Sequence, residues 1–221
     1  MKSPSPAATM ALHCTGLSQI TSAHQYFNAY KDIVAQMSYS AIDEIVDELL
    51  NCYLEGRAVF LFGNGGSAAL ASHFACDLGK GTLVDGNAKA RFRVFALTDN
   101  IPLITAWAND SSYERIFSEQ LQNLISPRDV AFGISGSGNS PNVLAALRVA
   151  RATGAVSMGL TGFDGGKMKS LCDYCVVVPS NNMQLVEDFH LGVVHAMFTV
   201  IRQRISEIVS SSLLVRATAS E

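Results

Sequence analysis

The sequence predicts a three-layer α/β sandwich built around a mostly parallel sheet, and three observations lead to that fold class. Two stretches with helical spacing of apolar residues open the chain. Five short apolar runs follow, each typical of a buried strand. A loop and then a helical stretch come after each run. That repeated order is typical of parallel strands joined by right-handed crossovers.

The helical opening contains two predicted helices. In residues 24–37 the apolar side chains recur at helical spacing. Ser40 caps the second helix, its apolar face extends from Ile42 to Tyr53, and Gly56 ends it. We therefore expect both helices to precede the first strand.

The remaining elements alternate along the chain. The predicted strands are residues 58–62, 93–97, 129–134, 155–160 and 174–178. The predicted later helices are residues 68–78, 101–108, 113–124, 141–153 and 183–208. Because no linker or fixed-period repeat interrupts this order, we predict one domain at 20–209. Residues 1–19 are predicted to be a mobile tail and residues 210–221 a C-terminal tail.

Composition and charge exclude two classes of function. The 221 residues carry 16 Lys and Arg against 19 Asp and Glu, a net charge of −3, so the basic footprint of a nucleic-acid-binding protein is missing. The sequence contains no run of about 18 apolar residues, the length that a membrane-spanning helix needs. The N-terminus does not resemble a signal peptide. We expect a cytoplasmic protein that binds neither nucleic acid nor membrane. The apolar content of 48% fits either a well-filled core or a surface hidden in an oligomer.

The cysteines predict a reduced protein. Five cysteines are present, and four lie inside apolar runs, which favours buried thiols over a disulfide framework. Cys172 and Cys175 form a C-x-x-C motif that leads directly into a predicted strand. Core packing is the favoured interpretation of this pair, and a redox or zinc role is the alternative.

Two loops rich in glycine and serine follow predicted strands. The first is Gly63-Asn-Gly-Gly-Ser67, and the second carries Ser135, Ser137 and Ser140. Ligands of a doubly wound sheet bind outside the carboxyl ends of its strands, where both loops lie. Glycines allow close approach of the backbone, and free N–H groups at the following helix favour an anion. The pair of loops predicts phosphate binding, with ordinary turns and helix caps as the alternative.

Acid–base or metal-binding side chains occur on two predicted helices. His73 and Asp77 are four residues apart and share a helix face. Glu187 and His195 are eight apart in the last helix, with His190 between them. Imidazole and carboxylate together suit zinc or general acid–base work near neutral pH. The alternative for each residue is a surface or core position, because spacing does not show whether the two helices meet.

These residues belong to six motifs that occur in a fixed order. They are Gly63-Asn-Gly-Gly-Ser67, His73-Phe-Ala-Cys-Asp77, Ala108-Asn-Asp110, Ser135-Gly-Ser-Gly-Asn-Ser-Pro-Asn142, Leu160-Thr-Gly-Phe-Asp-Gly-Gly-Lys167 and Glu187-Asp-Phe-His-Leu-Gly-Val-Val-His195. Over about residues 20–205 the chain resembles the sugar isomerase (SIS) family, and within it the phosphoheptose isomerase type.

The resemblance implies a fold, an assembly and a set of binding residues. The expected fold is a flavodoxin-like five-stranded parallel sheet with N-terminal helices, and the expected assembly is a homotetramer with active sites between subunits. The implied substrate- and phosphate-binding residues are Asn64, Gly65, Gly66, Ser67, Asn109, Asp110, Ser135, Gly136, Ser137, Ser140 and Glu187. The implied metal ligands are His73, Asp77, Glu187 and His195, with Zn²⁺ as the expected ion.

The implied activity is aldose–ketose isomerisation of a sugar phosphate. The substrate would be sedoheptulose 7-phosphate, converted to a heptose 7-phosphate through an enediolate, in a pathway leading to lipopolysaccharide. Asp77 would be the base and His195 the acid. Where the family usually has Glu and Gln, this chain has Asp77 and Glu187. The alternative function is a non-catalytic SIS adaptor of the replication-initiator-associating type or a sugar-phosphate sensor, whose relatives tend to lose the acid–base residues.

Overall fold

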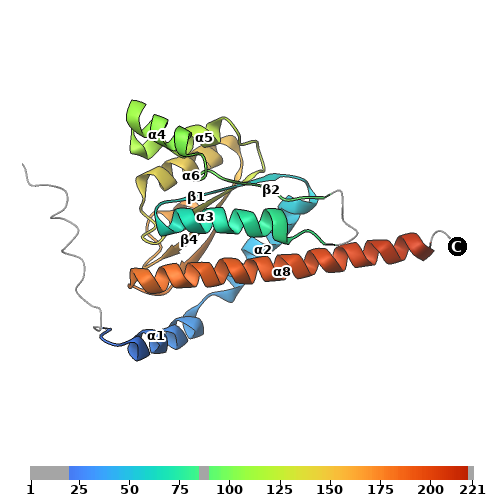
Figure 1. Ribbon diagram of the computed structural model, residues 1–221, viewed down its shortest axis with the longest axis horizontal. Coiled ribbons are helices and arrows are strands. Elements are labelled where there is room, and N and C mark those ends of the chain that lie inside the picture. Colours follow the sequence, from blue (N-terminus) through green and yellow to red (C-terminus); the bar gives the residue numbers. More distant parts are fainter. Residues whose placement is uncertain (1–19, 85–89, 219–221) are drawn as a thin grey trace, which may run out of the picture. The chain divides into compact units, whose positions relative to one another are not determined.

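The computed structural model describes residues 20–84 and 90–218, with side chains described as far as residue 211 (Figure 1). The chain divides into two compact units, one ending at Gln36 and the other beginning at Met37. Helix α1 (Ala23–Gln36) lies in the first unit and agrees with the helix predicted at 24–37. The single domain predicted over 20–209 stays a prediction. The tail predicted at 1–19 lies outside the described residues.

The second unit contains a parallel sheet of five strands, as predicted. The strands are β1 (Ala58–Gly63), β2 (Arg93–Ala96), β3 (Val130–Ser135), β4 (Val156–Gly162) and β5 (Tyr174–Val178). All four pairings are parallel, and the strand order is β2-β1-β3-β4-β5. The chain moves to one side of β1 to form β2 and then to the other side to form β3. The carboxyl ends of β1 and β3 therefore meet at the point where the strand order reverses, which is where such sheets bind ligands.

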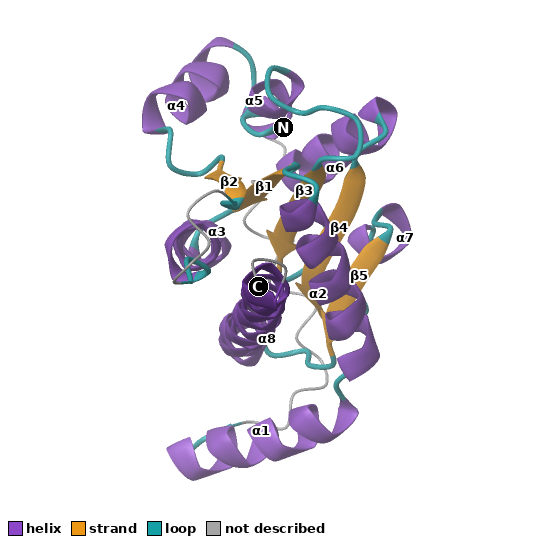
Figure 2. Cartoon of the chain, turned by 90° about the vertical axis from the view of Figure 1, so that its right-hand side faces the viewer, coloured by secondary structure: helices purple, strands orange, loops and turns teal. Residues whose placement is uncertain are grey.

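Helices cover both faces of this sheet and make the three predicted layers (Figures 1 and 2). One face carries α2 (Tyr39–Leu54), α3 (Gly66–Cys76) and α8 (Met183–Thr218). The other carries α4 (Ile101–Asp110), α5 (Ser118–Gln122), α6 (Pro141–Thr153) and α7 (Met168–Leu171). None of the described helices combines the length and apolarity that crossing a bilayer requires.

Aromatic side chains fill the core on both faces of the sheet. Successive residues of a strand point to opposite faces, so a buried central strand supplies both layers. Phe62 of β1 contacts Phe117 at a ring-centroid distance of 5.7 Å. Phe132 of β3 contacts Phe74 of α3 at 6.0 Å. All four rings are almost completely buried, which explains why the strands read as continuous apolar runs.

Three helices differ from the sequence prediction. The helix predicted at 113–124 is a 3-10 turn, η4 (Tyr113–Arg115), followed by the short helix α5. The helix predicted at 68–78 ends at Cys76 and continues as a π-helical turn, η3 (Asp77–Gly81). A Cβ on Gly81 would lie 2.6 Å from Phe198 Cζ of α8, so this turn approaches α8 as closely as only glycine allows. Helix α8 extends to Thr218, so the helix end predicted at 208 is wrong, and the C-terminal tail predicted at 210–221 stays a prediction. Serines there weaken the helix only slightly, and no glycine or proline stops it.

Core packing in β1 gives a direct test of the fold. Replacing Leu61, which is fully buried, with Ala should lower the free energy of unfolding by about 2–5 kcal/mol, because it leaves a cavity. Leu54→Ala is the matched control, since Leu54 is 55% exposed, and its effect should stay below about 0.5 kcal/mol. Urea unfolding followed by circular dichroism measures both. Equal effects of the two substitutions would contradict the described packing.

Candidate active site

The first glycine loop lies where the ends of β1 and β3 come closest. A Cβ on Gly63 would stand 2.7 Å from the Ile134 carbonyl oxygen and 2.7 Å from Ser67 Cβ, so no other residue fits there. Gly65 has φ +54° and turns the chain into α3, which begins at Gly66. The Asn64 carbonyl oxygen accepts from the Ser67 N–H at 2.9 Å, so the Gly66 N–H is the group that the start of α3 can offer a ligand.

An amide pair joins the two predicted phosphate loops. Asn64 Nδ2 donates to Asn142 Oδ1 at 2.9 Å, and Asn142 Nδ2 donates to Asn64 Oδ1 at 2.8 Å. The Tyr113 hydroxyl donates to the same Asn64 Oδ1 at 2.9 Å. The side-chain oxygen of Asn64 thus accepts two hydrogen bonds, and one hydrogen of its amide nitrogen is donated to Asn142. The other hydrogen on that nitrogen is the group that the side chain can offer a ligand. Asn64 therefore fixes the loops to each other, and its predicted substrate contact stays a prediction.

The serine loop forms a compact turn between β3 and α6. The hydroxyl oxygens of Ser135 and Ser140 lie 2.9 Å apart, and the Ser137 hydroxyl accepts a hydrogen bond from the Asn139 N–H at 3.3 Å. Gly138 has φ +64°, and a Cβ on it would lie 2.2 Å from the Gly165 carbonyl oxygen. Three hydroxyls thus gather at the N-terminus of the 13-residue helix α6. Hydroxyl donors at a helix N-terminus suit an anion such as phosphate.

Three of the predicted ionisable residues meet between α3 and α8. His73 Nε2 lies 2.8 Å from His195 Nε2 and 3.3 Å from Asp77 Oδ2, and His195 Nε2 lies 4.0 Å from the same oxygen. Asp77 Oδ2 is buried and makes no hydrogen bond of normal geometry with any described residue. The two imidazole side chains are about half exposed, at 47% and 49%. Spacing alone could not show this meeting, because the two histidines are 122 residues apart.

This donor set fits a divalent cation. One ligand atom from each of the three residues lies within 4.8 Å of the others. Two imidazoles and one carboxylate are ligands that Zn²⁺ accepts, and catalytic zinc sites commonly have three protein ligands. The buried, unbonded Asp77 oxygen is satisfied when a cation binds there.

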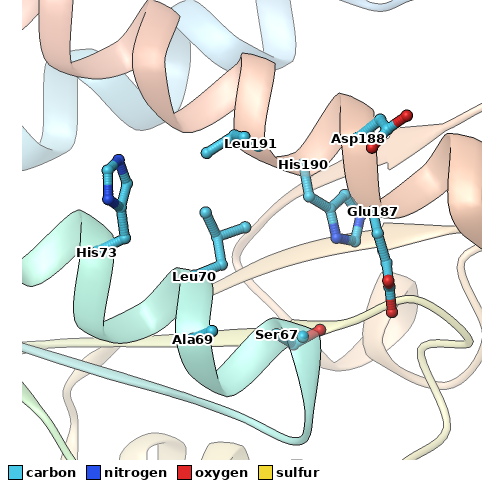
Figure 3. Close-up of a pocket in the computed structure, with 9 residues that line it drawn as sticks. Ser67, Ala69, Leu70, His73, Glu187, Asp188, His190 and Leu191 are labelled. Carbon is cyan, nitrogen blue, oxygen red and sulfur yellow. The ribbon is translucent and has the colours of Figure 1, made fainter.

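A pocket of about 380 Å³ lies between α3 and α8 (Figure 3). Helix α3 contributes Gly66, Ser67, Ala69, Leu70 and His73, and α8 contributes Glu187, Asp188, His190 and Leu191. Figure 3 shows Ser67 and Glu187 at one end of the pocket and His73 at the other. The volume falls in the range of small-molecule sites, and the pocket leads from the start of α3 to the ionisable group.

Glu187 lies apart from the three ionisable residues. Its carboxylate is beside Gly66, because a Cβ there would lie 3.2 Å from Glu187 Oε2. Eight residues separate Glu187 from His195, about 12 Å along the axis of α8. The structure brings together His73, Asp77 and His195, and it leaves the predicted fourth metal ligand near the phosphate loop.

The other predicted residues lie at the edge of this region. Asn109 and Asp110 end helix α4, where the Asn109 amide donates to Asp110 Oδ1 at 2.8 Å. Neither lines the pocket among the described residues, so their predicted sugar contact stays a prediction. Gly136 is needed for packing, since a Cβ there would lie 2.4 Å from the Met183 sulfur of α8.

The C-x-x-C cysteines pack into the structure. All the cysteines that the structure describes are free thiols. The sulfurs of Cys172 and Cys175 lie 2.9 Å and 3.1 Å from the point where Gly159 would carry a Cβ. The Cys172 thiol donates a hydrogen bond to the Cys175 sulfur. That bond, together with burial, raises the pKa of Cys172, and the same bond lowers the pKa of Cys175. A thiol held protonated and packed against a strand agrees with the favoured interpretation of core packing.

Comparison with known proteins settles the family. A family model described as SIS domain matches residues 25–162. The chain belongs to the SIS domain family. A phosphoheptose isomerase of Trichlorobacter lovleyi is 40% identical over 169 residues, 73% of this chain and 81% of its own. One of Paramagnetospirillum magneticum is 44% identical over 153 residues, 69% and 78% of the two chains.

Solved structures of SIS proteins agree with this assignment. A phosphoheptose isomerase from Francisella tularensis superposes with a TM-score of 0.75 at 27% identity, covering 81% of this chain and 96% of its own. One from Neisseria gonorrhoeae gives a TM-score of 0.72 at 29% identity, covering 80% and 92%. This SIS chain is thus of the phosphoheptose isomerase type, and its fold is the one that the sequence predicted.

Sequence reasoning missed the unusual state of His190. The side chain is 1% exposed, and neither ring nitrogen has a hydrogen-bond partner among the described residues. Burial lowers the pKa of His190 to about 4, and the nearby Thr161 backbone opposes that shift in part. The sequence did show His190 as an ionisable residue within the motif from Glu187 to His195. Nothing in its spacing distinguished a surface position from a buried one.

The lowered pKa of His190 predicts a loss of stability in acid. The unfolded chain takes up this proton below about pH 6.5 and the folded chain only near pH 4, so unfolding is favoured as the pH falls through that window. The expected contribution is about 3 kcal/mol, complete near pH 4. Urea unfolding should show a steeper loss between pH 6.5 and 4 for the wild type than for His190→Phe. Parallel curves for the two proteins would disprove the buried neutral state.

Proposed function

We propose that this SIS protein is a phosphoheptose isomerase that interconverts sedoheptulose 7-phosphate and a heptose 7-phosphate. The observation that carries the proposal is the pocket between α3 and α8. His73, which meets Asp77 and His195, lines one end of it, and the helix α3 N-terminus lies at the other. The names and structures of the relatives support the same activity. A cytoplasmic location and a role in heptose supply for lipopolysaccharide complete the proposal.

The phosphate binds at the two loops that the Asn64–Asn142 pair joins. The N–H groups of Gly66 and Asn142, at the starts of α3 and α6, have no hydrogen-bond partner among the described backbone groups, and the hydroxyls of Ser137 and Ser140 lie beside the start of α6. Helix N-termini and neutral hydroxyls bind an anion without arginine. Fixing the phosphate fixes the sugar along the pocket, which supplies the orientation that catalysis needs.

The reaction moves a carbonyl from C2 to C1 of the sugar. Asp77 removes a proton from C1, and the electrons of the broken C–H bond form the C1–C2 double bond of an enediol. His195 donates a proton to the C2 oxygen as that bond forms. The C1 hydroxyl then loses its proton to His195, and Asp77 returns its proton to C2. Asp77 Oδ2 and His195 Nε2 lie 4.0 Å apart, which lets both reach adjacent atoms of one substrate.

His73, Asp77 and His195 would also hold the divalent ion, with Zn²⁺ as our assignment. When bound, such an ion supplies positive charge for the oxygen on which negative charge develops. Metal binding and proton transfer both use Asp77 and His195, so each residue performs these two tasks in turn and not at the same time. Asp is one methylene shorter than the usual Glu, and the π-helical turn that begins at Asp77 sets where its carboxylate lies.

A homotetramer completes the proposed enzyme. His73 and His195 are half exposed, so a second copy can cover the open side of the site. Helix α4 has no buried residue, and Ile101 and Leu103 on it are 61% and 42% exposed. Exposed apolar side chains on a short helix are typical of an interaction surface.

Loss of either proposed acid–base residue should abolish turnover. Asp77→Asn and His195→Ala should each lower kcat by about 10²–10⁴-fold, because each step needs a positioned proton carrier. NMR in D₂O with sedoheptulose 7-phosphate measures both product formation and exchange at C1 and C2. His24→Ala is the control, since His24 lies on α1 away from the pocket residues in sequence. Wild-type binding without turnover would instead favour the adaptor or sensor alternative.

Removing a proposed metal ligand should remove the metal. His73→Ala should weaken zinc binding by at least about tenfold, because a two-ligand site remains. Equilibrium dialysis with metal analysis measures the zinc content of the purified protein without reference to activity. Unchanged zinc content in His73→Ala and in His195→Ala would show that the ion binds elsewhere.

The oligomeric state gives an independent test of the assembly. Multi-angle light scattering should give about four times the 23.6 kDa chain mass. Ile101→Asp should reduce that mass, because a buried unpaired charge destabilises an apolar contact. Leu124→Asp serves as a control, since Leu124 is also exposed but lies outside α4. A monomeric wild-type protein would contradict the proposed assembly.

A further inference from the structure

His190 is a buried polar side chain with at least one ring nitrogen left unpaired. It lies on α8, three residues after Glu187, and it lines the pocket opposite Ser67 and Leu70 (Figure 3). The side chain is 1% exposed, and neither ring nitrogen makes a hydrogen bond of normal geometry with a described residue, although the Thr161 backbone contacts the ring. Buried polar groups in proteins are almost always hydrogen-bonded, so an exception in a pocket wall points to a ligand.

The chemistry of that ligand follows from the state of the ring. Burial keeps the imidazole neutral at pH 7, because its pKa is lowered to about 4. A neutral imidazole offers one N–H donor and one acceptor nitrogen. A phosphate or carboxylate would be bound better by a charged ring. A hydroxyl can both accept and donate, so it is the matching partner.

The position of the ring agrees with a hydroxyl of the sugar chain. Figure 3 shows the His190 ring near Ser67 and Glu187, with His73 at the far end of the pocket. Six residues of α3 separate Ser67 from His73, about 9 Å along the helix. A sugar phosphate with its phosphate at the loops and its carbonyl near His73 has hydroxyl-bearing carbons in between.

We propose that His190 is a further substrate-binding residue, whose imidazole forms a hydrogen bond with a hydroxyl of the sugar chain. The proposal rests on the proposed function, because it needs a sugar phosphate lying along the pocket. Two histidines of α8 then have different tasks. His195 transfers protons at the carbonyl end of the substrate, and His190 binds a hydroxyl of the sugar chain while its imidazole stays neutral.

Binding of two ligands to matched variants tests this role. Sedoheptulose 7-phosphate and inorganic phosphate are titrated by calorimetry into the full chain carrying Asp77→Asn, so that binding is measured without turnover. Adding His190→Phe should weaken sugar-phosphate binding about tenfold, or about 1.4 kcal/mol, and leave phosphate binding within about twofold. His190→Gln retains a donor and an acceptor and should restore most of the affinity.

A measurement on the unsubstituted ring guards against misfolding of the variants. Ring ¹⁵N chemical shifts of His190 in the wild type should change on adding the sugar phosphate and stay unchanged on adding phosphate. The proposal would be overturned if His190→Phe weakened the binding of sugar phosphate and of phosphate equally. It would also be overturned if sugar-phosphate affinity and ring shifts stayed unchanged. His190 would then have a structural role or bind a water molecule. If the wild type binds phosphate but no sugar phosphate, the proposed function itself fails.

Discussion

The close approach of strands β1 and β3 at their carboxyl ends is the constraint on which the rest of the site depends. Gly63 ends β1 with its Cα facing the Ile134 carbonyl oxygen, and a Cβ at 2.7 Å from that oxygen would force the strands apart. Because the strands stay close, Asn64 and Asn142 can form two hydrogen bonds between the loops. One steric requirement thereby places two helix N-termini beside each other, and their combined partial positive charge is available to an anion.

The second contact that shapes the site is between α3 and α8. Glycine at position 81 allows the π-helical turn after α3 to approach Phe198, and this turn begins with Asp77. The fold therefore delivers the carboxylate, His73 and His195 to one point from three separate elements. A buried oxygen of Asp77 without a hydrogen bond is costly in an isolated chain. Such a cost is reasonable at a site that binds a cation or a substrate, and π-helical turns are frequent at functional sites.

Much of the fold could be predicted from the sequence, because local patterns determine it. Apolar runs such as 174–178 predicted their strand to the residue, and the glycine and serine loops follow β1 and β3 as expected. The shared helix face of His73 and Asp77 also follows from spacing, although a π-helical turn replaces the regular helix at Asp77. What local patterns could not supply is the pairing of elements. The contact between His73 and His195 depends on how α3 and α8 pack, and so does the distance of Glu187 from His73. Burial of His190 has the same origin, since its helix face is determined by what packs against it.

A crystal structure of the full protein with zinc and sedoheptulose 7-phosphate tests the central claim most directly. We expect the phosphate at the two loops, within hydrogen-bonding distance of Ser137 and Ser140. We also expect C1 and C2 in contact with Asp77 and His195, with the sugar chain lying along the pocket between α3 and α8. A sugar bound with its phosphate away from these loops, or with its carbonyl carbons away from Asp77, would contradict the account.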